Sequence, residues 1–226
     1  IRLSLVGSEM CIRDRPHSVA PCATLPRAGP LPPEVVAVVL AAGRSSRTAP
    51  HHKLLATYEG VPQIVRIIRR LAASRLVGIT TVIGHDADKL RPLIEALPTR
   101  VLVNPDHDGG LAGSVKMGFA AGMPADGVMM VPADMPLLET AHIDALIAAF
   151  VPGSLVVATD QGAMRNPVIL PASMAAAVDT LSGDTGARRL VRDCASVRLV
   201  ELGAAASCDI DTTAAILSTG GHLPKD

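Results

Sequence analysis

The sequence predicts a three-layer α/β/α protein with a Rossmann-like, mostly parallel, doubly wound sheet. Two observations carry this prediction. From residue 34 onward, short β-branched runs alternate with longer stretches that have apolar residues at helical spacing. Apolar residues make up 49% of the chain and aromatic residues only 1%, so aliphatic side chains and methionine must build the core. Such a core is typical of a parallel sheet that is covered by helices on both faces.

The expected strands are short apolar runs that end at glycine, proline or polar residues. They cover residues 35–40, 77–83, 100–103, 127–131 and 155–158. The helices expected between them cover residues 62–74, 86–97, 114–122 and 140–150. In the first of these helices, Ile64, Ile67, Ile68 and Leu71 recur at helical spacing. The order βαβαβαβαβ indicates a doubly wound sheet.

The C-terminal part of the chain is less regular. We expect strands over residues 167–170 and 196–202, and helices over residues 174–181 and 184–193. No repeat and no long linker is visible, so residues 34–226 are expected to form a single domain.

The N-terminal residues 1–33 are expected to stand outside this fold. Residues 1–15 have no sustained period and resemble a translated sequencing-adapter peptide, and residues 16–33 are rich in proline. We interpret them as an artefact followed by a disordered leader, with a native flexible extension as the alternative.

Composition excludes several classes of function. The formal net charge is +0 and aromatic residues are scarce, so neither charge nor stacking platforms favour a nucleic-acid partner. The four cysteines show no C-x-x-C spacing, which favours a reducing cytoplasm over a disulfide or zinc framework. No apolar run approaches the roughly 18 residues that span a bilayer, so no membrane association is expected.

The most informative segment follows the first strand. A loop of small residues lets backbone N–H groups approach a polyphosphate, and its cations neutralise phosphate charge. The expected nucleotide-binding residues of this segment are Leu40, Ala41, Ala42, Gly43, Arg44, Ser45, Ser46, Arg47 and Lys53. His51 and His52 lie in the same loop and are expected to be exposed, without a defined role, with contact to phosphate as the alternative. A nucleoside triphosphate is therefore the first candidate ligand.

Two other phosphate-binding classes do not fit this loop. A Walker loop ends in Gly-Lys-Ser/Thr, whereas Lys53 stands between His52 and Leu54. A dinucleotide fingerprint needs G-x-G-x-x-G, and this loop contains one glycine, Gly43. The sequence thus argues against a P-loop NTPase and against hydride transfer.

Asp134 follows the apolar strand expected over residues 127–131. An unpaired carboxylate is costly to bury, and Mg²⁺ is usually held by one or two carboxylates together with phosphate oxygens. Near the C-terminus, strand alternation would place Asp209 and Asp211 on one face. A magnesium site that includes Asp134 is therefore expected, with a helix or turn cap as the alternative role for Asp134 and a helix cap for Asp211. Asp209 is a weaker candidate for the site.

Residues 40–47 and Lys53 resemble the L-A-A-G-x-S-x-R…K-L signature of the molybdenum cofactor nucleotidyltransferases, a family of cytidylyltransferases and guanylyltransferases. Thr48 and Ala49 replace its common Met-Gly. Further matching segments extend the resemblance over nearly all of residues 35–213. They are residues 110–114 (G-L-x-x-S), 131–136 (A-D-M-P), 165–168 (G-N-P-V), 183–188 (G-D-x-G-A-R) and 209–212 (D-I-D-T). Arg165 replaces the glycine of the G-N-P-V element, which would alter the fit of the acceptor.

The resemblance implies a fold of the nucleotide-diphospho-sugar transferase type and roles for single residues. Arg47 and Lys53 would hold the β and γ phosphates, and Asp211 would join Asp134 at Mg²⁺. Ser114 would contact the nucleotide, although capping a helix is an equally ordinary role for this serine. Asn166 and Arg188 would lie on the acceptor side. Arg47, Lys53 and Asp134 form the expected catalytic set.

The resemblance also implies a reaction. A terminal phosphate of molybdopterin would attack the α-phosphorus of CTP and expel pyrophosphate, and a molybdenum hydroxylase would receive the product. Ala41 and Ala42 favour CTP, because the guanylyl branch usually has Ala-Gly-Gly there. GTP as donor, another phosphorylated acceptor, and a non-catalytic cofactor-binding chaperone are the alternatives.

Overall fold

The computed structural model describes residues 31–184, 190–191, 194 and 196–224. The chain divides into two units, residues 1–32 and 33–226, and every helix and strand described below belongs to the second. Residues 1–30 of the predicted leader and most of the helix expected over residues 184–193 lie outside the described residues. In the part that the structure describes, no helix is long and apolar enough to cross a membrane.

The centre of the fold is a sheet in which seven strands pair among the described residues. They are β1 (Val35–Ala41), β4 (Gly78–Ile83), β5 (Arg100–Val103), β6 (Gly127–Pro132), β7 (Leu155–Asp160), β8 (Ala163–Pro171) and β9 (Val197–Glu201). Their order is β5-β4-β1-β6-β8-β7-β9. Every pair is parallel except those that β8 makes with β6 and β7. The prediction of a mostly parallel, doubly wound sheet is confirmed.

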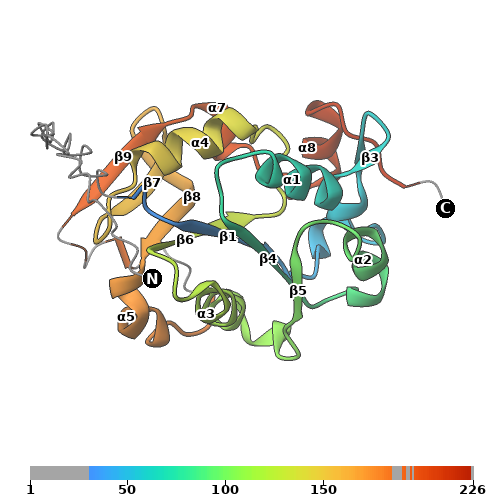
Figure 1. Cartoon of the computed structure of the whole chain (residues 1–226). Coiled ribbons are helices and arrows are strands. Elements are labelled where there is room, and N and C mark those ends of the chain that lie inside the picture. Colours follow the sequence, from blue (N-terminus) through green and yellow to red (C-terminus); the bar gives the residue numbers. More distant parts are fainter. Residues whose placement is uncertain (1–30, 185–189, 192–193, 195, 225–226) are drawn as a thin grey trace, which may run out of the picture. The chain divides into compact units, whose positions relative to one another are not determined.

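Helices cover both faces of this sheet (Figure 1). One layer contains α1 (Gln63–Ala72), α2 (Ala87–Ile94) and α4 (Thr140–Ala149), and the opposite layer contains α3 (Leu111–Gly122) and α5 (Ala175–Asp179). The remaining elements are short. They are the strands β2 (Thr57–Tyr58) and β3 (Val61–Pro62), the helices α7 (Ala204–Ser207) and α8 (Thr213–Ser218), and the 3-10 turns η1 (Ser46–Thr48), η2 (Lys53–Leu55), η3 (His107–Gly109) and η4 (Ala172–Met174).

Strand β1 shows why the sequence folds in this way. Val35, Ala37 and Val39 point into the cluster formed with α1 and α4, whereas Val38 points into the cluster formed with α3. All four are buried, as expected for a central strand of a parallel sheet that is covered on both sides.

Three details differ from the sequence prediction. Helix α3 begins at Leu111 after Gly110, whose φ of 97° suits glycine, so Ser114 lies inside the helix and does not cap it. Strand β8 covers residues 163–171 and not 167–170, because Gln161 and Gly162, both at positive φ, turn the chain directly back from β7. The helix expected over residues 174–181 is shorter, with α5 preceded by η4.

The carboxyl ends of the parallel strands β1, β4 and β6 meet at one edge of the sheet. In open α/β sheets, ligands bind at this edge, near the strand at which the order of the sheet reverses. Strand β1, between β4 and β6, occupies that position.

Candidate active site

A cleft of about 1070 Å³ opens at this edge of the sheet. The loop after β1, the start of α3, the end of β6, part of β8 and the segment after α7 line it. All the residues expected in the phosphate loop contribute to this lining: Leu40, Ala41, Ala42, Gly43, Arg44, Ser45, Ser46, Arg47 and Lys53. The volume is in the range of pockets that hold a small molecule or cofactor.

Thr48 shapes the loop from within. Its side chain is buried, and its Oγ1 lies 2.9 Å from the carbonyl oxygens of both Ser45 and His51. Ser45 adopts a left-handed conformation with φ of 53°, which starts the η1 turn. Thr48, which departs from the family pattern, therefore links the backbone at Ser45 to the backbone at His51.

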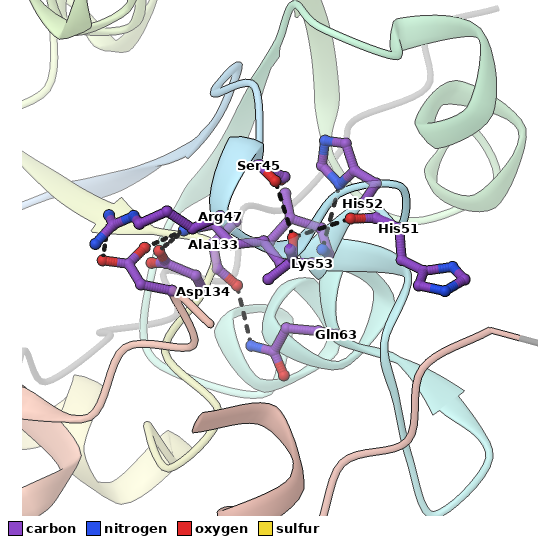
Figure 2. A network of polar contacts seen from close by, with 11 residues as sticks. Ser45, Arg47, His51, His52, Lys53, Gln63, Ala133 and Asp134 are labelled. Atoms are coloured by element: carbon purple, nitrogen blue, oxygen red, sulfur yellow. Dashed lines mark hydrogen bonds and ion pairs between the residues drawn. The ribbon is translucent and has the colours of Figure 1, made fainter. Parts of the chain in front are cut away.

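Lys53 joins two carboxylates at the floor of the cleft. Its Nζ donates a hydrogen bond to Asp134 and another, at 2.7 Å, to Oδ1 of Asp211. Nη2 of Arg47 donates to the other oxygen of Asp211, also at 2.7 Å. Figure 2 shows this network of polar contacts, which includes Arg47, Lys53 and Asp134. The Lys53 and Asp134 side chains are only 16% and 15% exposed, so water screens this pair weakly.

The pKa values of this group follow from its contacts. Burial lowers the pKa of Lys53, but the charges and hydrogen bonds of Asp134 and Asp211 outweigh it and raise the pKa above its usual value. For Asp211, burial raises the pKa, and the contacts with Lys53 and Arg47 outweigh it and lower the pKa. The geometry thus favours a protonated lysine beside an ionised aspartate at neutral pH.

The backbone fixes Asp134 in place. Ala133 donates to the carbonyl of Leu40 at 3.1 Å, and its own carbonyl accepts from Nε2 of Gln63 at 3.0 Å. The carbonyl of Asp134 accepts from the N–H of Ile210 at 3.0 Å. The segment after α7 is therefore hydrogen-bonded to the residue that follows β6.

Ile210 also explains where Asp211 lies. It is fully buried in a small cluster with Tyr58 and Ile216, and this contact orients the residues on either side of it. The segment is not a strand, so strand alternation does not apply to Asp209 and Asp211, although both residues line the cleft. Asp211 contacts Lys53, whereas Asp209 lines the cleft and makes no ion pair with any residue that the structure describes.

The carboxylates of Asp134 and Asp211 converge on one cation, the ammonium of Lys53. Across the described ranges, no group of three or more histidine, cysteine or acidic side chains could hold a metal ion by itself. Two carboxylates facing an open cleft suit Mg²⁺, which commonly completes its shell with water and phosphate oxygens. The residues present therefore fit a magnesium ion that arrives with a nucleotide.

The other expected site residues take different positions. Ser114 lines the cleft, and its Oγ accepts a 3.0 Å hydrogen bond from Nδ2 of the buried Asn104. Asn166 lines the cleft from β8. Gly183 accepts a 3.0 Å hydrogen bond from Ala112, and Asp184 after it reaches the cleft. Arg188 lies outside the described residues.

The structure adds Asp108 to the cleft and changes the expectation for His52. Asp108 faces Arg44, whose Nε donates to it at 2.6 Å, and both residues line the cleft. The place of Asp108 in a polar segment after a strand was the only signal for it in the sequence. His52 was expected to be exposed, and that prediction is wrong. Its side chain is buried, its Nδ1 accepts from the N–H of Leu54 at 3.3 Å, and burial lowers its pKa to about 4.

Comparisons with known proteins agree with this architecture. A family model described as the MobA-like NTP transferase domain matches residues 37–200. The purine catabolism protein PucB of Bacillus subtilis is 31% identical over 169 residues, which cover 71% of this chain and 82% of that protein. The nicotine blue oxidoreductase of Paenarthrobacter nicotinovorans is 28% identical over 172 residues, which cover 71% of this chain and 82% of that protein.

A third relative is similar to this chain over a shorter length. The 2-C-methyl-D-erythritol 4-phosphate cytidylyltransferase of Streptomyces coelicolor is 34% identical over 130 residues, which cover 54% of this chain and 48% of that protein. The shared part is therefore about half of that cytidylyltransferase.

Solved structures share the fold. A nucleotidyl transferase from Methanothermobacter thermautotroptrophicus superimposes with a TM-score of 0.74 at 20% identity, covering 83% of this chain and 96% of that chain. Rv0371c of Mycobacterium tuberculosis, in complex with manganese, superimposes with a TM-score of 0.70 at 22% identity, covering 83% and 98%.

The fold and the family match together define the protein as a nucleotidyltransferase. More particularly, the chain belongs to the family of MobA-like NTP transferase domains, because the family model spans most of it. The fold expected from the resemblance is confirmed, and so is the resemblance at the level of this family.

Proposed function

We propose that the protein transfers a cytidine monophosphate group from CTP to molybdopterin and releases pyrophosphate. The observation that supports this most directly is the meeting of Arg47 and Lys53 with Asp134 and Asp211 in a cleft beside a loop of small residues. Such a cleft has cations for a triphosphate and carboxylates for its accompanying metal.

The chemistry requires positioning and charge neutralisation more than covalent participation of the protein. An oxygen of the acceptor phosphate forms a bond to the α-phosphorus, and the bond between the α-phosphorus and the bridging oxygen breaks. Arg47 and Lys53 would hold the β and γ phosphates, with backbone N–H groups of residues 42–46 beside them. The charge that develops on the departing pyrophosphate would then be neutralised by fixed cations.

Asp134 and Asp211 would hold Mg²⁺. The ion would supply neutralisation of phosphate charge when bound. Support comes from the convergence of both carboxylates on one cation and from the manganese complex of Rv0371c, a protein of the same fold. Lys53, already bonded to both carboxylates, is placed to keep them oriented in the absence of nucleotide.

Two observations support CTP as the donor. Ala41 and Ala42 match the cytidylyl form of the loop, and a relative 34% identical over part of the chain is named as a cytidylyltransferase. Molybdopterin as the acceptor rests on the family resemblance as a whole, in which the element at residues 165–168 lies on the acceptor side. A molybdenum hydroxylase as the recipient of the product, and the cytoplasm as the compartment, rest on the same resemblance and on the cysteine usage.

A second candidate acceptor is a polyol or sugar phosphate. The name of the Streptomyces coelicolor relative, which acts on 2-C-methyl-D-erythritol 4-phosphate, favours it. The fold and donor side would be the same, and only the acceptor side would differ.

The test is a pyrophosphate-release assay with purified protein and Mg²⁺. CTP and GTP are each paired with molybdopterin and with 2-C-methyl-D-erythritol 4-phosphate. We expect release with CTP and molybdopterin, and loss of release in Asp134→Ala. Undiminished turnover in Asp134→Ala would overturn the metal assignment. Stoichiometric binding of molybdopterin without release of pyrophosphate would show that the protein is a cofactor carrier and not a transferase.

A further inference from the structure

The cationic side chains that line the cleft differ in whether they have a carboxylate partner. Among the described residues, its lysine and arginine side chains are Arg44, Arg47, Lys53 and Arg165. The first three are ion-paired: Arg44 with Asp108, and Arg47 and Lys53 with the two carboxylates of the cleft floor. Within this part of the chain, the side chain of Arg165 makes neither an ion pair nor a hydrogen bond, although Asp184 and Asp209 line the same cleft.

Arg165 stands on β8, directly before Asn166. Strand β8 pairs antiparallel with β6 up to Met130 and Val168, and beyond that point the two strands reach the cleft with Pro132 and Asn166. Since β6 leads into Asp134, Arg165 belongs to the same region as the carboxylates. It comes from a different wall than the phosphate loop, which is built from the segment after β1.

One atom of the Arg165 side chain is unfavourably placed. Its Nε is shielded from solvent and has no hydrogen-bond partner in the described part of the chain. A buried donor of a charged group normally has an acceptor, because leaving it unpaired costs the full desolvation of that group. The planar fork of a guanidinium, Nε together with one terminal nitrogen, fits two oxygens of a phosphate.

We propose that Arg165 binds the phosphate monoester of the acceptor and so determines which acceptors the enzyme accepts. This inference rests on the proposed function, because it places an acceptor phosphate opposite the donor triphosphate. Two anionic groups must approach each other before transfer, and a cation without a carboxylate partner reduces their repulsion. The ligand class is therefore a dianionic phosphate monoester, with Nε and the guanidinium terminus of Arg165 as donors.

The experiment compares the wild type with Arg165→Gln and Arg165→Lys. Arg198→Gln is the matched control, because Arg198 is exposed on β9, outside the cleft lining, and the variant loses the same charge. The donor site is first filled with Mg²⁺ and the α,β-methylene analogue of CTP, and inorganic phosphate is then titrated by calorimetry. The KM for molybdopterin and for CTP and the kcat are measured in parallel, and thermal unfolding checks that each variant is folded.

We expect Arg165→Gln to weaken phosphate binding roughly 10- to 100-fold, the effect of removing a charged hydrogen-bond donor. The KM for molybdopterin should rise by a similar factor, while the KM for CTP stays unchanged. Arg165→Lys should lie between these values, since it keeps the charge and loses the fork. Arg198→Gln should match the wild type.

Equal phosphate affinity in the wild type and Arg165→Gln would overturn the inference, and so would a wild type that binds no phosphate. A failure of the proposed function would give a different experimental result from a failure of this inference. In that case the wild type releases no pyrophosphate with any acceptor, whereas the phosphate titration still separates Arg165→Gln from Arg198→Gln.

Discussion

The ammonium of Lys53 donates a 2.7 Å hydrogen bond to the carboxylate of Asp211, which lies 158 residues later in the chain. The same ammonium contacts Asp134. One cation thus holds together the loop after β1, the end of β6 and the C-terminal segment. The candidate active site is therefore also a point of tertiary connection.

Replacing Lys53 with methionine should destabilise the protein. The substitution keeps most of the side-chain volume but leaves two partly buried carboxylates facing each other, and we expect a loss of about 1–3 kcal/mol at pH 7. Chemical denaturation measures it. In the double variant Lys53→Met/Asp211→Asn the repulsion is absent, so part of the loss should be recovered. Equal stability of Lys53→Met and the wild type would show that the contact contributes nothing.

The two neighbouring aspartates should differ in activity. Asp211→Asn should reduce kcat/KM for pyrophosphate release about 100-fold or more, because it removes one charge from the proposed magnesium site. Asp209→Asn is the matched control, since Asp209 lines the same cleft without contacting Lys53. Its kcat/KM should stay close to the wild-type value. A larger effect at Asp209 would reverse the assignment of the second carboxylate.

His52 should make stability depend on pH. Its pKa is about 4 in the folded protein and about 6.5 in an unfolded chain, so the unfolded state binds more protons between these values. The free energy of unfolding should therefore fall by about 3 kcal/mol as the pH decreases from 7 to 4. In His52→Asn, whose side-chain oxygen can still accept from Leu54, this contribution should vanish. An identical pH profile in the variant would contradict the burial of a neutral imidazole.

Helix α3 should respond differently to alanine at two glycines. A Cβ on Gly118 would lie 2.2 Å from Cγ1 of the buried Val38, so Gly118→Ala should lower the free energy of unfolding by about 1–3 kcal/mol. A Cβ on Gly113 would meet its nearest atom at 3.4 Å, and Gly113→Ala should be neutral or stabilising by up to about 1 kcal/mol. Chemical denaturation of both variants decides this. Equal effects would mean that α3 does not pack closely on β1.

Much of the fold was predictable because its signals are local. The alternation of β-branched runs with helical spacing gave the strands β1, β4, β5, β6 and β7 to within about two residues. The direction of β8 could not be predicted, because an apolar run has the same pattern in a parallel and an antiparallel strand. The two-residue turn at Gln161 and Gly162, which reverses the chain, became visible only in the backbone.

Some residues of the candidate active site could likewise be predicted from the sequence, and others could not. The phosphate loop and Asp134 each follow a strand, so their place at one edge of the sheet could be predicted from the order of elements. Asp211 was named on a family resemblance, and the geometric argument offered for it was wrong. Its position depends on the burial of Ile210 and on a backbone bond to Asp134, contacts between residues far apart in sequence.

The amino-acid sequence alone therefore specified the class of fold, the phosphate loop and the carboxylate at the end of β6, because each depends on residues that are neighbours along the chain. Only the tertiary structure decided which residues meet Lys53, why His52 is neutral and which cleft arginine has a side chain without a partner among the described residues. These properties depend on burial and on charges brought together from distant segments, and no local pattern encodes such contacts.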